Sequence, residues 1–91
     1  MRPDADGWMF AALADARRRE GRFVEAIEYY QKALRLDPSR VEWRCQLAQL
    51  FADTGDIEKA MKEAETCLRD RPKYSRADRL IQELRRLPRM E

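Results

Sequence analysis

The amino-acid sequence predicts an all-α fold made of two helical repeats of 34 residues, followed by a fifth helix. The composition favours helix throughout, because only three of the 91 residues are glycine, while 44% are hydrophobic and 40% are charged. Identical residues also recur at a fixed offset along the chain. The matching pairs are Leu13 and Leu47, Ala14 and Ala48, Gly21 and Gly55, Ala26 and Ala60, Leu34 and Leu68, Arg35 and Arg69, and Pro38 and Pro72. A single offset shared by matches across an entire unit indicates a repeat architecture.

Each repeat is expected to contain two antiparallel helices that are joined at a glycine. Apolar residues occur at steps of three and four on both sides of Gly21, which is the spacing of an amphipathic helix. Gly21 and Gly55 can adopt the left-handed conformation that ends a helix, and Asp56 is a suitable N-cap for the helix that follows. The five helices are expected near residues 7–20, 23–36, 40–53, 57–70 and 75–87.

A proline follows the second helix of each repeat, and it separates the repeat from the next helix because proline cannot continue a helix. Ser39 with Glu42 predicts a capping box at the start of the third helix. Ser75 with Asp78 predicts a weaker version at the start of the fifth helix, and Pro88 is expected to end that helix.

These residues resemble the tetratricopeptide repeat, a family of helix pairs with small and aromatic residues at fixed positions in a unit of 34 residues. The first unit, 7–40, supplies Phe10, Leu13, Ala14, Ala26, Tyr30, Ala33 and Pro38. The second unit, 41–74, supplies Leu47, Ala48, Phe51, Ala60, Ala64, Cys67 and Pro72. Arg17 and Arg44 depart from the pattern, because an aromatic residue is usual at both positions. The resemblance implies one domain, 1–91, folded as a right-handed superhelix of helix pairs.

The two ends of this array are expected to differ. Residues 75–91 resemble the extra helix that closes such arrays, and its apolar face is expected to comprise Leu80, Ile81, Leu84 and Leu87. The first helix has no comparable cover over Trp8, Met9 and Phe10. Three alternatives remain open for that end: the chain is cut from a longer array, it self-associates through the N-terminal helix, or it is a monomer that buries these residues locally.

The resemblance implies a non-catalytic protein-interaction module, in which the first helices of successive repeats line a concave groove that holds a peptide or a partner helix. By position, the candidate groove residues of the first repeat are Trp8, Ala11, Ala12, Asp15 and Arg18. Those of the second repeat are Glu42, Cys45, Gln46, Gln49 and Ala52. The capping helix could add Arg76, Arg79 and Glu83. The identity of the protein or peptide partner does not follow from the sequence.

Some members of the family bind the C-terminal carboxylates of heat-shock chaperones through a clamp of lysine, arginine and asparagine. That clamp is absent from this sequence, which has Ala11, Asp15, Cys45, Gln46 and Gln49 at the positions where lysine and asparagine would be expected. An acidic tail could still bind if other cations converge, because guanidinium groups bind carboxylates with two hydrogen bonds. The cations in question are Arg18, Arg19, Arg76 and Arg79.

Other functional classes are disfavoured by what the sequence lacks. An enzyme, a cofactor site and a metal site are not expected, because the chain has no histidine, no glycine-rich loop and no cluster of ligands. Nucleic-acid binding is not expected either. Residues 69–91 hold eight basic and four acidic residues, but acids are interspersed and no base-reading motif occurs. No segment has the length and hydrophobicity of a membrane span or the apolar core of a signal peptide.

The cysteines and the second tryptophan have simple structural interpretations. Cys45 and Cys67 are expected to be reduced thiols on adjacent helices rather than a disulfide or a metal site, which favours a cytoplasmic location. Trp43 is expected in the core, near Tyr30 or Leu34, rather than in contact with a ligand.

Overall fold

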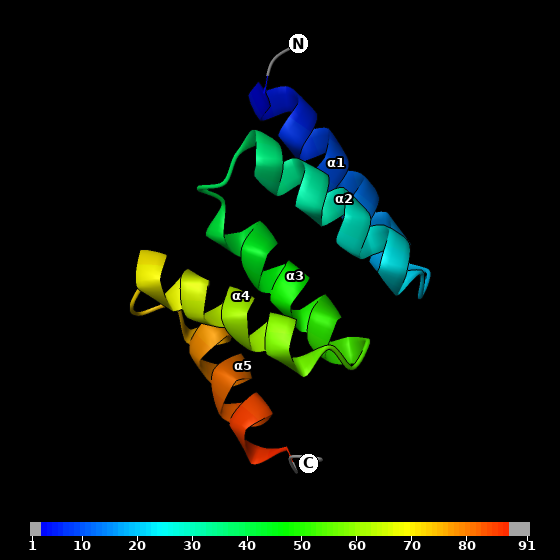
Figure 1. Cartoon of the computed structure of the whole chain (residues 1–91). Helices are drawn as coiled ribbons and strands as arrows, with labels where there is room; N and C mark the ends of the chain where they lie inside the picture. Colours follow the sequence, from blue (N-terminus) through cyan, green and yellow to red (C-terminus); the bar gives the residue numbers. More distant parts are fainter. Residues whose placement is uncertain (1–2, 88–91) are drawn as a thin grey trace.

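Five helices make up the protein in the computed structural model, which describes residues 3–87 (Figure 1). They are α1 (Pro3–Arg19), α2 (Phe23–Leu36), α3 (Val41–Asp53), α4 (Ile57–Asp70) and α5 (Ser75–Arg86). The described residues contain helices and turns and no strand, so the all-α prediction is confirmed. Within these residues, every helix is too short or too polar to cross a bilayer. Pro88, the expected end of the last helix, lies outside the described residues.

The helices follow one another as a stack. Each packs on the next along the chain, and α3 also contacts α5. In Figure 1 the α1–α2 pair lies at the N-terminal end, the α3–α4 pair follows, and α5 covers the C-terminal side. The stack measures 45 × 29 × 19 Å along its principal axes. Its shape follows from the repeat, because a single helix pair buries its apolar face only against a neighbouring pair.

The close packing of the two helices within each pair depends on small residues. Ala14 and Ala26 in the first pair, and Ala48 and Ala60 in the second, are all 0% exposed and belong to the main core. A larger side chain at any of these positions would push the two helices apart, since protein interiors are close-packed.

The turns within the repeats form as expected. Gly21 and Gly55 have φ angles of 79° and 87°, which residues with a Cβ rarely adopt. Asp56 caps α4, because its side chain accepts a hydrogen bond of 3.4 Å from the backbone N–H of Lys59. The glycine turns and this cap are therefore confirmed.

The two predicted capping boxes are wrong. Arg40 and Tyr74 are the N-cap residues of α3 and α5, and neither makes a side-chain capping hydrogen bond. At the first of these turns, Ser39 donates its hydroxyl to Asp37 Oδ1 at 2.6 Å, and its backbone N–H also points to that oxygen at 3.3 Å. The carboxylate of Asp37, two residues earlier, thus holds Ser39 in the turn, where its side chain cannot cap the helix.

The first helix begins earlier than expected, at Pro3 rather than near residue 7. A proline suits the first turn of a helix because that turn needs no backbone N–H donor. Gly7, which the sequence suggested as a boundary, instead lies buried within α1. A Cβ at Gly7 would lie 3.2 Å from Trp43 Cη2, so glycine permits α1 to approach the Trp43 ring closely.

The core includes most of the residues expected there. Trp43 is 6% exposed and belongs to the main core with Tyr30 and Leu34, as predicted. Three of the four apolar residues expected on α5, Leu80, Ile81 and Leu84, are buried. Leu87 is 46% exposed because it follows the last turn of α5, so its assignment to the buried face was wrong.

Candidate functional site

A shallow pocket of about 270 Å³ lies between α1 and α3, with one residue from α2 in its wall. Its lining residues are Trp8, Ala11, Ala12, Asp15, Tyr30, Glu42, Trp43 and Gln46. We call this set the α1/α3 groove. Six of the candidate groove residues are brought together here: Trp8, Ala11, Ala12, Asp15, Glu42 and Gln46. Ala11 forms part of the floor, since it is only 6% exposed, whereas Ala12 is exposed.

One end of the groove is aromatic. Trp8 is 54% exposed, and its ring meets the ring of Trp43 edge-on, with centroids 5.2 Å apart and an interplanar angle of 89°. The guanidinium of Arg40 lies 5.1 Å from the Trp8 centroid and 5.7 Å from that of Trp43. These contacts hold Trp8 in place while leaving half of its surface exposed to a ligand.

The other end of the groove carries Asp15, which is paired with Arg18 and Arg19, two arginines that are not among the residues lining the pocket. Arg18 Nη2 donates to Asp15 Oδ1 at 2.6 Å, and Arg19 Nε lies 3.0 Å from Asp15 Oδ2. The hydrogen bond from Arg18 is the main reason that the pKa of Asp15 is lowered, so this carboxyl stays ionised. Burial raises the pKa of Tyr30 beside them, so its phenol stays protonated and can donate a hydrogen bond.

The remaining candidate groove residues lie apart from this pocket. Gln49 is half-buried and donates from Nε2 to Asp53 Oδ1 at 3.0 Å, and Ala52 packs against the main core. The three candidates on α5 are all exposed, and none of them is among the residues that line the pocket: Arg76, Arg79 and Glu83.

Cys45 does not reach the groove, and its assignment there was wrong. Its side chain is 3% exposed and belongs to a small second core with Val41, Cys67 and Ala77. Both cysteines are free thiols on the adjacent helices α3 and α4. The hydrogen bond to Cys45 and burial raise the pKa of Cys67, so its thiol stays protonated. The described residues contain no group of three or more side chains that could hold a metal ion.

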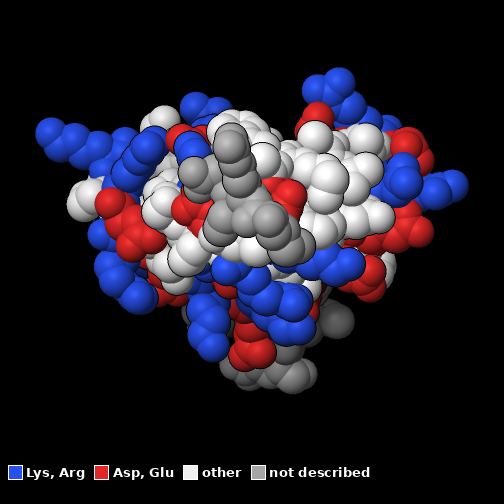
Figure 2. Space-filling model, turned by 90° about the horizontal axis from the view of Figure 1, so that it is seen from above, with Lys and Arg blue, Asp and Glu red and all other residues white. Residues whose placement is uncertain are grey.

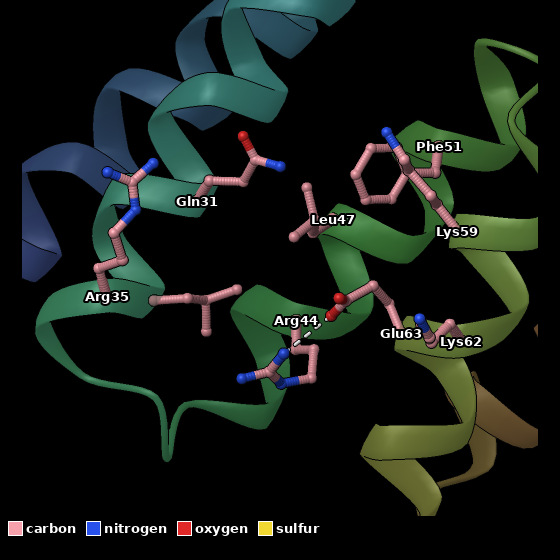
Figure 3. A pocket seen from close by; sticks show the side chains of 9 residues that line it. Gln31, Arg35, Arg44, Leu47, Phe51, Lys59, Lys62 and Glu63 are labelled. Carbon is pink, nitrogen blue, oxygen red and sulfur yellow. Dashed lines mark hydrogen bonds and ion pairs between the residues drawn. The ribbon is translucent and has the colours of Figure 1, made fainter.

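A larger pocket of about 540 Å³, not anticipated from the sequence, opens between α2 and α4 above α3 (Figure 3). Its lining residues are Gln31, Leu34, Arg35, Arg44, Leu47, Phe51, Lys59, Lys62 and Glu63. We call it the α2/α4 cleft. The signal that could have located it is the arginine at position 44, where the repeat pattern has an aromatic residue. Arg44 Nη1 donates to Glu63 Oε2 at 2.8 Å, and both side chains lie in the wall of the cleft.

Charge on the rest of the surface is mixed. Figure 2, which views the molecule from above, shows lysine and arginine side chains next to aspartate and glutamate side chains around the edge of this face. Arg17, at the end of α1, is paired locally. Its Nη1 lies 3.0 Å from Glu20 Oε1, and its Nε lies 3.3 Å from Glu25 Oε2. Among the described residues on this face, basic side chains are therefore interspersed with acidic ones and do not form the continuous basic area that tracks a nucleic-acid backbone.

Comparison with known proteins places these features in a family. The family model described as tetratricopeptide repeat matches residues 17–84. A TPR repeat-containing thioredoxin, TTL4 of Arabidopsis thaliana, is 33% identical over 66 residues, which are 72% of this chain and 10% of that protein. Superkiller protein 3 of Saccharomyces cerevisiae is 30% identical over 71 residues, which are 78% of this chain and 5% of that protein. The chain thus spans a tenth or less of these two relatives.

Solved structures share the fold. The Sgt2 TPR domain from Aspergillus fumigatus superposes with a TM-score of 0.82 at 25% identity, covering 87% of this chain and 52% of that chain. The second TPR domain of human RPAP3, solved in complex with an HSP70 peptide, superposes with a TM-score of 0.85 at 20% identity. This match covers 91% of this chain and 69% of that chain. Domains of this family generally mediate contacts between proteins. By its helix pairs, its small-residue crossings and the match of its sequence, this chain belongs to the tetratricopeptide repeat family.

Proposed function

We propose that this chain is a non-catalytic module that binds a peptide or a helical segment of a partner protein in the α1/α3 groove. The observation that carries the proposal is the groove itself, which combines an exposed, braced Trp8 at one end with the ionised Asp15 at the other. The family relationship supports it, as does the human RPAP3 domain that was solved with a bound peptide.

The lining chemistry suggests which peptide would fit. An apolar side chain of the ligand can stack on the exposed part of Trp8, and the small Ala12 lets a peptide backbone approach the helix closely. The amide of Gln46 can donate to a backbone carbonyl and accept from a backbone N–H. Arg18 and Arg19 are both engaged by Asp15, so they do not form a free pair of cations for an acidic tail. A ligand without a strong negative charge therefore fits this groove best.

Affinity capture with a groove variant and a surface control tests the proposal. The variant is Trp8→Ala/Gln46→Ala, and the control is Val24→Ala, which removes a side chain that is 66% exposed on α2. We expect the wild type and the control to capture the same protein, and the groove variant to lose it. A photoreactive residue at position 12 should then cross-link to the captured protein, whereas one at Glu65 on α4 should not. Undiminished capture by the groove variant would refute binding in this groove.

A second candidate function is stacking through α1, either on another copy of this chain or within a longer array. The observation that favours it is the exposed apolar row on α1, which comprises Ala5, Met9, Ala12 and Ala16. Within the described residues, α1 makes most of its contacts with α2, and Met9 remains 50% exposed. We expect light scattering to show a mass that rises with concentration and returns to one chain in Met9→Glu but not in Trp8→Ala. A mass of one chain at all concentrations would exclude self-association.

A further inference from the structure

The α2/α4 cleft lies where the two repeats differ in chemistry. In the first repeat, Phe10 stacks on Tyr29, with ring centroids 6.2 Å apart and an interplanar angle of 21°. The residues at the same positions in the second repeat, 34 places later, are Arg44 and Glu63, which form the ion pair of 2.8 Å. An aromatic pair in one repeat is thus an ion pair in the other, and that ion pair lies in the wall of the cleft.

The cleft has an apolar floor. Leu34, Leu47 and Phe51 line it and are 3% to 7% exposed, and they come from two helices. The gap above this floor remains open because α2 and α4 each pack on α3 but do not pack closely on each other. A volume of about 540 Å³ is within the range of pockets that bind ligands, so an apolar side chain of a partner can enter it.

The walls of the cleft are basic on both sides. Arg35 projects from α2, and Lys59 and Lys62 project from α4, on the opposite side of the floor (Figure 3). The lining contains four cationic side chains and one carboxylate, and that carboxylate, Glu63, is already paired with Arg44. Within residues 3–87, neither Arg35 nor Lys62 lies within 4.0 Å of a carboxylate. Two cations on facing walls are therefore available to an anionic partner.

We propose that the α2/α4 cleft is a second docking surface, which binds an acidic segment of a partner protein that carries an apolar anchor side chain. The anchor contacts Leu47 and Phe51, and carboxylates on either side of it pair with Arg35 and Lys62. Charge complementarity selects an acidic segment, and the apolar floor selects a protein over a polynucleotide, whose affinity depends on many phosphate contacts.

This surface does not depend on the function proposed for the α1/α3 groove. The two sites use different faces of α3: Arg44 and Leu47 line the cleft, whereas Glu42 and Gln46 line the groove. One chain can therefore hold a peptide in the groove and an acidic segment in the cleft at the same time. Failure at either site leaves the other untouched, so the two proposals can be tested separately.

Fluorescence anisotropy with labelled synthetic probes tests the cleft. The main probe is an amphipathic peptide with glutamates on one helical face and leucines on the other. A peptide of glutamates alone and a single-stranded oligothymidine serve as comparison probes. We expect saturable binding of the amphipathic peptide only. The variant Arg35→Glu/Lys62→Glu should weaken that binding by about tenfold or more, because two attractive charges become repulsive.

A matched variant separates local pairing from general charge. Lys73→Glu/Arg86→Glu changes the net charge equally at two exposed positions outside the cleft, and it should alter the affinity by no more than about twofold because salt screens distant charges. Arg35→Gln/Lys62→Gln should give an intermediate loss, and circular dichroism verifies that each variant is folded. In amide NMR spectra, the peptide should shift Gln31 and Leu47 but leave Gln46 unchanged.

Three results would overturn the proposal. The first is an absence of saturable binding of the amphipathic peptide to the wild type. The second is an equal loss of affinity in the cleft variant and in the matched variant. The third is binding of the glutamate peptide or the oligothymidine as tightly as the amphipathic peptide, which would show that the cations attract any polyanion.

Discussion

Removing one partner of the ion pair between Arg44 and Glu63 should destabilise the protein, whereas replacing both partners with aromatic residues should stabilise it. In Glu63→Ala, Arg44 loses its hydrogen bond of 2.8 Å and keeps only a contact of 3.4 Å from Nη2 to the carbonyl of Pro38. Arg44 Nε is already buried without a partner, so the guanidinium cannot recover the loss at that atom.

The magnitude follows from the exposure of the two side chains, which is 19% for Arg44 and 23% for Glu63. Breaking a fully buried ion pair costs roughly 3–5 kcal/mol, and a hydrogen bond to a charged group contributes roughly 1.5–3 kcal/mol. Because water still reaches about a fifth of each side chain, we expect Glu63→Ala to lower the free energy of unfolding by about 2 kcal/mol. In a domain of this size, that corresponds to a fall in Tm of roughly 8–16 °C.

Arg44→Phe/Glu63→Tyr copies the pair of the first repeat into the second. It removes two partly desolvated charges and adds an aromatic contact worth about 0.5–1.5 kcal/mol beyond area burial. We expect the free energy of unfolding of the double variant to exceed that of the wild type by about 1–2 kcal/mol, because well-packed apolar residues often match or exceed the stability that an ion pair gives at such positions.

Urea denaturation followed by far-UV circular dichroism measures both changes. The control is Glu65→Ala, an exposed acid on the same helix, which should change stability by less than about 0.5 kcal/mol. A stability of Glu63→Ala equal to that of the control, or unfolding of the double aromatic variant at a lower urea concentration than the wild type, would show that the ion pair does not act in this way.

Three further predictions concern the repeat turns, the helix crossings and the polar end of the groove. Gly55→Ala should lower the free energy of unfolding by about 1–2 kcal/mol in urea denaturation, because its φ of 87° is strained for alanine; a neutral effect would contradict this. Ala48→Leu should lower the free energy of unfolding by about 1–3 kcal/mol, because Ala48 is 0% exposed and the core has no room for a larger side chain. A stabilising effect would contradict the close packing of the two helices at this position. The hydrogen bond from Arg18 lowers the pKa of Asp15 below the usual range of an aspartate, so this pairing stabilises the fold fully above that range, and the stabilisation is lost as the pH falls through the lowered pKa. The free energy of unfolding of Asp15→Asn, measured as the pH is lowered, should therefore fall less steeply than that of the wild type. The same dependence on acid pH in both proteins would contradict this.

The repeat architecture could be predicted from the sequence because its determinants are local and periodic. Gly21 and Gly55 mark turns that require a positive φ, and this requirement acts through the backbone of a single residue. The alanines at the crossings recur at the same offset because both pairs meet the same packing constraint. The boundaries of four of the five helices were consequently predicted to within one residue.

The errors arose where a side chain had more than one possible partner. Ser39 matched a capping pattern, but the carboxylate of Asp37 was closer to its hydroxyl in the folded turn. Cys45 was placed in the groove by its position in the repeat, whereas in the structure it faces Cys67 in the second core. The α2/α4 cleft was missed because Arg44 counted only as a departure from the pattern. Its consequence depends on Glu63, which lies 19 residues away on another helix.

NMR titration of the isotope-labelled domain with the peptide identified by cross-linking shows directly whether the ligand binds in the α1/α3 groove, since amide shifts report on every position of α1 and α3 at once. If the peptide binds in the groove, the largest changes occur at Ala12, Asp15 and Gln46, together with the indole N–H of Trp8. Unchanged signals at these four residues, with the peptide bound elsewhere on the domain, would contradict it.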